Sequence, residues 1–214
     1  MGIDTSALIS SAIDFPRTVP NRAGRRRSMA AQLSLSPMKD RSGRVRGYLA
    51  TMPRAEDPDH EITALDWTVR THQTLDPKTF LAAPLSPAAL LQLAESSSSG
   101  EQWWAGIMVI LEPARFGRRQ AEHRDAVDTL RALGLQVGLS GHRVADACGY
   151  DALLVEPSSA AAEIERDGAL LIVTGIVDAD ALRWAEENDA DLYEGPAIGA
   201  PIRIAPIDVS RLTR

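Results

Sequence analysis

Two stretches, Gly106-Ile-Met-Val-Ile-Leu111 and Ala169-Leu-Leu-Ile-Val173, decide the expected fold because both are continuously apolar. A strand with one face in water alternates apolar and polar residues, whereas a strand buried on both faces does not. From residue 31 onward, short apolar runs of this kind alternate with helical patterns, which is typical of βα units around a parallel sheet. We therefore expect an α/β protein whose central strands are buried on both faces.

Eight segments have the composition of strands, at residues 32–37, 44–52, 79–85, 105–111, 135–139, 150–155, 169–174 and 190–194. The first two flank Asp40-Arg-Ser-Gly43, a hairpin turn, so the first strand should be antiparallel to the second. Eight strands with intervening helices favour a TIM-like (β/α)8-type barrel. Residues 31–206 span only 176 positions, whereas this fold normally needs roughly 200 or more. We therefore predict a shortened barrel in which some helices are short or absent.

Three of the helices are indicated by apolar residues at three- and four-residue spacing. One begins at Ser86-Pro87 and ends before a run of serines. A second ends at Gly134, after apolar positions at Ala126, Val127, Leu130 and Leu133. The third is capped by Asp178 and should bury Ala181, Leu182 and Ala185.

The charge of the chain is unevenly distributed. The formal net charge is −6, which argues against a protein that binds nucleic acid through its overall charge. Residues 1–46 hold nine basic and three acidic residues, and the remaining 168 hold 14 basic and 26 acidic ones. We expect a poorly ordered basic tail at residues 1–28, a barrel domain at residues 29–206 and a C-terminal tail at residues 207–214.

Composition also bears on location. The single cysteine, Cys148, excludes a disulfide framework and favours a reducing compartment. No apolar run reaches 18 residues, so no membrane span is expected. The pattern of a secretory signal peptide is also missing from the sequence. These observations predict a cytoplasmic protein.

Four segments of the chain match the motifs of one known family, in the right order. Leu35-Ser-Pro-Met-Lys-Asp-Arg-Ser-Gly-Arg-Val-Arg-Gly-Tyr48 resembles the family's opening hairpin. Leu130-Arg-Ala-Leu-Gly-Leu-Gln-Val-Gly-Leu139 resembles the helix and strand that precede its Asp-Asp-Phe-Gly motif. Leu171-Ile-Val-Thr-Gly-Ile-Val-Asp178 is similar to V-V-A-E-G-V-E-T, and Ala190-Asp-Leu-Tyr-Glu-Gly-Pro-Ala-Ile-Gly-Ala-Pro201 resembles A-D-Y-V-Q-G-Y-L-F-G-R-P. By these segments the chain resembles the EAL domain, the bacterial cyclic di-GMP phosphodiesterase family; the resemblance covers most of residues 31–206 and implies a barrel of EAL type.

The resemblance also implies a vestigial catalytic site. Family members bind two divalent cations through carboxylates and an Asn at strand ends, and these ions activate water against a phosphodiester. At the matching positions this chain has Leu49 for the motif Glu, Pro84 for the Asn, Ser140 and Gly141 for paired Asp residues, Leu154 for the catalytic Lys, Thr174 for a Glu and Glu194 for a Gln. Only Glu112 keeps the family's residue. Because hard cations need several converging oxygen ligands, we expect no Mg²⁺ or Mn²⁺ cofactor and no phosphodiester hydrolysis.

Three interpretations of function remain open. The first is a catalytically inactive EAL-like domain that acts as a regulatory protein-interaction module in bacterial signalling and has a protein partner. The second is a metal-free cyclic di-GMP receptor, in which Arg54, Arg115 and Arg143 near the rim loops are the candidate phosphate-binding residues. The third is an active enzyme that requires Glu112.

Three further features are weaker candidates. Glu112, Glu156 and Glu194 lie at predicted strand ends and would form a rebuilt metal site if they converged. Asp57-Pro-Asp-His60-Glu61 is rich in oxygen and nitrogen donors and leads into a helix. Trp103-Trp104 either covers the outer wall of the barrel or forms an exposed docking patch.

Overall fold

The computed structural model describes residues 30–52, 58–96, 106–112, 120–141, 149–157 and 168–208. The chain divides into two compact units, one formed by Ala31–Ile207 and the other by Met1–Ala30 with Asp208–Arg214. The predicted basic tail at residues 1–28 lies outside the described residues. In the described part of the chain, no helix has the length and apolar character needed to cross a bilayer.

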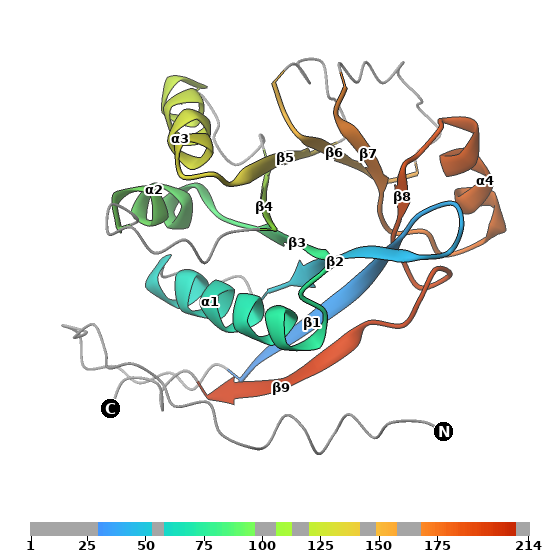
Figure 1. Ribbon diagram of the computed structural model, residues 1–214, viewed down its shortest axis with the longest axis horizontal. Helices are drawn as coiled ribbons and strands as arrows, with labels where there is room; N and C mark the ends of the chain where they lie inside the picture. Colours follow the sequence, from blue (N-terminus) through green and yellow to red (C-terminus); the bar gives the residue numbers. More distant parts are fainter. Residues whose placement is uncertain are drawn as a thin grey trace. The chain divides into compact units, whose positions relative to one another are not determined.

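Eight strands close into a barrel, with the four described helices outside the ring (Figure 1). The strands are β1 (Ala30–Lys39), β2 (Val45–Thr51), β3 (Phe80–Pro84), β4 (Ile107–Leu111), β5 (Gln136–Ser140), β6 (Ala152–Val155), β7 (Leu170–Val173) and β8 (Leu192–Tyr193). Neighbours from β2 to β8 are parallel, and β1 is antiparallel to both β2 and β8. This arrangement confirms the predicted TIM-like barrel with an antiparallel first strand.

A ninth strand, β9 (Ile202–Asp208), lies beside β1. The sequence pattern does not predict this strand. Its last two residues fall in the segment expected to be a C-terminal tail. The other eight strands all occur where apolar runs predicted them, each within a few residues of the expected bounds.

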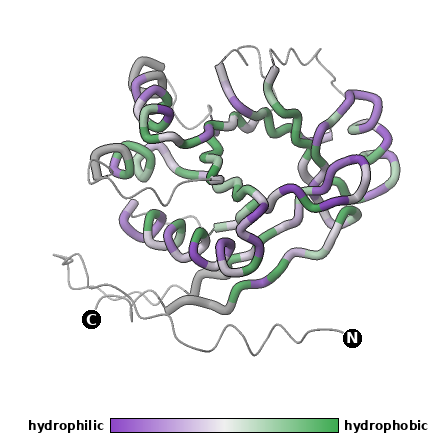
Figure 2. The backbone as a smooth tube through the Cα atoms, in the orientation of Figure 1, coloured by the Kyte–Doolittle hydropathy of each residue, from purple (hydrophilic) through white to green (hydrophobic). Residues whose placement is uncertain are grey.

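The continuously apolar runs are buried, as their composition predicts. All residues of β4 and of β6 are buried. Side chains from six strands meet in the barrel interior, at Met38, Ala82, Met108, Ile110, Ala152, Leu154, Ile172 and Leu192. The expected burial fails at one residue, since Leu170 at the start of β7 is exposed. Figure 2 shows hydrophobic residues around the ring of strands, whereas hydrophobic and hydrophilic residues alternate along the helices.

Four helices connect the strands in the described ranges: α1 (Pro58–Leu75), α2 (Pro87–Ser96), α3 (Gln120–Ala132) and α4 (Ala179–Glu187). The predicted cap at Asp178 is present, and Ser86 caps α2 as well. Asp178 Oδ1 accepts a hydrogen bond of 2.9 Å from the backbone N of Ala181, and Ser86 Oγ accepts one of 3.2 Å from Ala89 N. On α4 only Ala185 is buried, whereas Ala181 and Leu182, which the sequence predicts to be buried with it, are half-buried.

The loop between β8 and β9 is fixed by a close backbone approach at Gly195. Its φ is +143°, a region that side-chain-bearing residues avoid. A Cβ placed on Gly195 would lie 2.3 Å from the backbone N of Ile176. Ile176 N in turn donates a 2.9 Å hydrogen bond to the carbonyl of Glu194. The β7–α4 and β8–β9 loops are therefore in direct backbone contact, and this contact leaves no room for a side chain at Gly195.

We predict that Gly195→Ala lowers the free energy of unfolding by about 3 kcal/mol, because it adds a backbone clash to an unfavourable φ. Gly134→Ala is the matched control, since Gly134 also has positive φ but nothing within 4 Å of a built Cβ. Strain alone should cost the control about 1 kcal/mol. Urea denaturation measures both, and equal losses would contradict the proposed clash.

The β1–β2 turn is organised by one carboxylate. Asp40 accepts hydrogen bonds from Ser42 Oγ at 2.6 Å, from Ser42 N at 2.9 Å and from Arg46 Nε at 2.7 Å. The Asp40 backbone N also donates to the Arg44 carbonyl at 2.9 Å. The hydroxyl of Ser42 and the guanidinium of Arg46 hold the pKa of the Asp40 carboxyl well below its usual range.

This lowered pKa predicts a pH dependence. A carboxyl whose pKa falls on folding stabilises the protein above its unfolded pKa of about 4, and the contribution disappears as the pH falls through the folded value. Asp40→Asn should therefore destabilise the protein more at pH 7 than at pH 3. Urea denaturation at both pH values tests this, with the exposed Asp128→Asn as the control. A loss that is the same at both pH values would contradict it.

Candidate functional site

A cavity of the described barrel lies at the carboxyl ends of its parallel strands, where barrel enzymes place their chemistry. Its volume is about 460 Å³. It is lined by Leu49, Ala50, Thr51, Met52, Glu61, Pro84, Ser86, Ile110, Glu112, Ser140, Leu154, Glu156 and Thr174.

Six of the eight residues predicted to mark a vestigial site line this cavity: Leu49, Pro84, Glu112, Ser140, Leu154 and Thr174. The other two, Gly141 and Glu194, do not. Gly141 donates its backbone N–H to the carbonyl of Leu154 at 3.3 Å. Glu194 Oε2 accepts a 3.2 Å hydrogen bond from Gly175 N, so this carboxylate serves the neighbouring loop.

The bottom of the cavity is formed by residues of the hydrophobic core. Ile110 and Leu154 line the cavity and also belong to the apolar cluster inside the barrel. Leu154 is only 4% exposed, and Leu49 packs partly buried against the same cluster. These side chains give the strand ends an aliphatic surface that has no group able to donate, accept or carry a proton.

Polar groups surround this aliphatic bottom. Hydroxyls come from Thr51, Ser86, Ser140 and Thr174, and carboxyls come from Glu61, Glu112 and Glu156. Glu112 is half-buried and Glu156 is exposed. Within the described ranges, no three His, Cys, Asp or Glu side chains are grouped so that they could hold a metal ion. The suggested trio of Glu112, Glu156 and Glu194 does not line one cavity, because Glu194 lies outside it.

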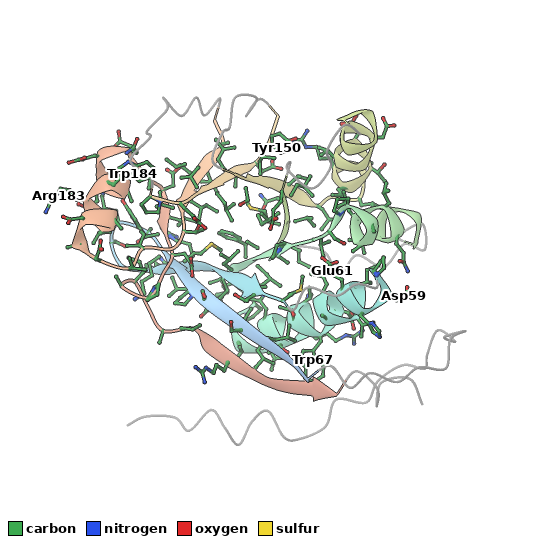
Figure 3. The ribbon with its side chains drawn as sticks, turned by 180° about the vertical axis from the view of Figure 1, so that it is seen from behind. Asp59, Glu61, Trp67, Tyr150, Arg183 and Trp184 are labelled. Atoms are coloured by element: carbon green, nitrogen blue, oxygen red, sulfur yellow. The ribbon has the colours of Figure 1, made fainter. Side chains whose placement is uncertain are left out.

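Glu61 is the site residue whose role the sequence did not reveal. It lies in the first turn of α1 and is only 6% exposed. Its Oε1 accepts a 2.6 Å hydrogen bond from the backbone N of Ser86, at the start of α2. Asp59, also in the first turn of α1, accepts a hydrogen bond through its Oδ1 from Gln92 Nε2 of α2. Figure 3 shows Asp59 and Glu61 at the start of α1, so carboxylates join the first turn of this helix to the next βα unit.

Several predicted residues fall outside the described ranges. They are Asp57, Arg54, Arg115, Arg143, Cys148 and the pair Trp103-Trp104. The candidate phosphate-binding arginines and the proposed docking patch therefore stay predictions. Of the donor-rich segment that ends at Glu61, the described carboxyls of Asp59 and Glu61 accept hydrogen bonds from α2 and from the residue preceding it.

The comparisons with known proteins give structural matches only. No protein-family model matches the chain, and no curated protein matches it. The EAL domain of Mycobacterium smegmatis DcpA matches with a TM-score of 0.64 and 14% identity, over 86% of this chain and 96% of that domain. An EAL domain protein from Listeria monocytogenes matches with a TM-score of 0.56 and 12% identity, over 86% and 91% of the two chains.

The fold is that of an EAL domain. Klebsiella pneumoniae BlrP1 matches with a TM-score of 0.63 and 15% identity, over 86% of this chain and 60% of that one. The chain thus spans about 60% of the length of BlrP1. In this EAL-type barrel the cavity lies at the carboxyl ends of β2 to β7, and its bottom is aliphatic.

We predict that Glu61→Ala lowers the free energy of unfolding by about 2 kcal/mol, because the half-buried Ser86 N–H loses a charged acceptor. Glu187→Ala on the exposed side of α4 is the control and should change stability by less than about 0.5 kcal/mol. Urea denaturation gives both values. If the two variants lose the same stability, the α1–α2 connection does not depend on this hydrogen bond.

Proposed function

We propose that this chain is a catalytically inactive EAL-type domain that works as a regulatory protein-interaction module in cyclic di-GMP signalling. We place it in the cytoplasm of a bacterium. The proposal has two parts, the absence of catalysis and the role in cyclic di-GMP signalling, and different observations support them.

The aliphatic bottom of the cavity is the observation that carries the first part. Hydrolysis by two divalent ions needs several carboxylates that converge from neighbouring strand ends. Here the strand ends bring Leu49, Pro84 and Leu154 into the cavity, and Ser140 and Thr174 offer only hydroxyls. Leu154 stands where the resemblance places the catalytic Lys, so the cavity also lacks an ammonium at that position. Glu112 alone keeps the family's residue.

The structural neighbours support the second part. Crystal structures of BlrP1 are complexes with cyclic di-GMP and calcium or manganese. Vibrio cholerae LapD, matched with a TM-score of 0.62 and 8% identity, has a structure bound to c-di-GMP. Because the present chain shares their fold, a place in the same signalling system is the natural assignment. A barrel without the ligands for catalysis would then act through what it binds.

A metal-free cyclic di-GMP receptor is the second candidate, and the LapD complex favours it. The described lining of the cavity contains carboxyls but no Lys or Arg. Two phosphates would therefore need cations from the rim loops, for which Arg54, Arg115 and Arg143 are the sequence candidates. The receptor thus depends on residues outside the described lining, and for this reason we rank it second.

Hydrolysis and binding of cyclic di-GMP separate these functions. We expect the full chain, incubated with cyclic di-GMP and either Mg²⁺ or Mn²⁺, to form no linear product by chromatography, because the strand ends supply too few metal ligands. An active EAL domain serves as the positive control. Turnover that disappears in Glu112→Ala would overturn the proposal in favour of an enzyme. Without turnover, isothermal titration decides the rest: micromolar or tighter binding indicates the receptor, and no heat supports the interaction module.

A further inference from the structure

An exposed apolar residue lies in the β7–α4 loop, whose first residue, Thr174, lines the cavity. Val177, between β7 and α4, is 65% exposed, the largest value among the exposed large hydrophobic residues that the structure describes. The loop that follows β8 also carries exposed apolar residues, and its Ala197 N–H donates a hydrogen bond to the carbonyl of Ile176, the residue before Val177. We define the rim surface as Val177, Pro196 and Ala197, the exposed apolar residues at this junction of the two loops. Exposed apolar residues that gather on neighbouring loops indicate a binding surface more strongly than single ones do.

The backbone of the rim surface is held in one conformation. Ala197 N donates to the Ile176 carbonyl at 3.0 Å, which joins the two loops that carry the surface. Lys39 Nζ donates to the Ile198 carbonyl at 2.7 Å and ties the second loop to β1. Gly195 provides the close approach described above. Because the loops are already ordered, a partner would lose little conformational entropy from this side on binding.

Three carboxyl groups lie along the loop that carries Val177. Glu194 accepts from Gly175 N, and Glu156 Cγ lies 4.0 Å from a Cβ built on Gly175. Asp178 follows Val177 and caps α4. In the described part of the chain, none of these three carboxyls is in an ion pair with Lys or Arg. Glu156 also lines the cavity, so the acidic border joins the barrel mouth to the apolar loop.

We propose that the rim surface is the docking site for a segment of a partner protein in which apolar side chains lie next to Lys or Arg. The apolar side chains bury Val177 and Ala197, and the basic ones face Glu156, Asp178 and Glu194. This inference rests on the proposed function, since it gives the interaction module its surface. Apolar contact supplies affinity at the centre of an interface, and complementary charge at the border supplies orientation and partner choice.

Two synthetic peptides provide the test, and both have Leu at the same positions. The remaining positions are Lys in one peptide and Glu in the other. Each peptide carries a fluorescent label for anisotropy titration with the full chain. We expect the Leu–Lys peptide to bind at least about tenfold more tightly than the Leu–Glu peptide. Val177→Ser should weaken the Leu–Lys peptide about tenfold, which corresponds to about 1.4 kcal/mol for an exposed Val that becomes buried.

Leu170→Ser is the matched control. Leu170 is also an exposed apolar residue, but it lies at the start of β7, at the opposite end of that strand from Val177. This variant should bind the Leu–Lys peptide as the unaltered chain does. Glu156→Gln should weaken only the Leu–Lys peptide, since the charge it removes faces Lys. The docking site would be overturned if Val177→Ser left the affinity for the Leu–Lys peptide unchanged. It would also be overturned if Val177→Ser and Leu170→Ser lowered that affinity equally.

Other occupants have distinct outcomes. Sedimentation that shows a dimer of the unaltered chain and a monomer of Val177→Ser would assign the surface to a second copy and overturn the proposal. Binding to phosphatidylcholine vesicles that depends on Val177 would assign it to a lipid surface and would overturn it equally. Turnover of cyclic di-GMP would refute the proposed function but leave the peptide result standing. An affinity for the Leu–Lys peptide that Val177→Ser does not change would refute only the docking site.

Discussion

Closure of the barrel depends on the two edges of β1. One edge pairs antiparallel with β2 from Ser34 to Lys39, and the other meets β8 at Lys39 and Tyr193. The parallel strands β2 to β8 on their own would leave two open edges, which expose unpaired backbone groups. Because β1 joins both edges, the carboxyl ends of β2 to β7 face a common cavity. The turn at Asp40, which sets the start of β2 opposite the end of β1, therefore contributes to the site from outside it.

Most of the fold could be predicted from the sequence because its signals are local. Buried parallel strands appear as apolar runs, and the positions of Gly134 and Asp178 mark helix ends through backbone geometry and capping. β9 was missed because Ile-Arg-Ile-Ala-Pro-Ile-Asp contains Pro206, which weakens a strand pattern. At the edge of a sheet this proline is tolerated, since β9 pairs with β1 alone among the described strands. A sequence does not state which strand will be at an edge.

The candidate site could be predicted in part. Matching to a family motif placed six residues on the cavity lining, because strand ends keep their order around a barrel. The role of Glu61 could not be predicted, since its partner Ser86 lies 25 positions away and neither residue is unusual for a helix start. The rim surface was hidden for a different reason. Val177 follows a run of apolar residues that are mostly buried, and hydrophobicity alone does not distinguish the last buried residue from the first exposed one.

Leu154 has two roles, as a cavity-lining residue and as a member of the core, and this has a consequence for changes at the site. It lies beside Ile172 on the neighbouring strand and belongs to the same apolar cluster, so a polar or charged side chain in its place would lose that packing. The composition of the cavity and the stability of the barrel are therefore coupled through one side chain, and a substitution there would change both at once.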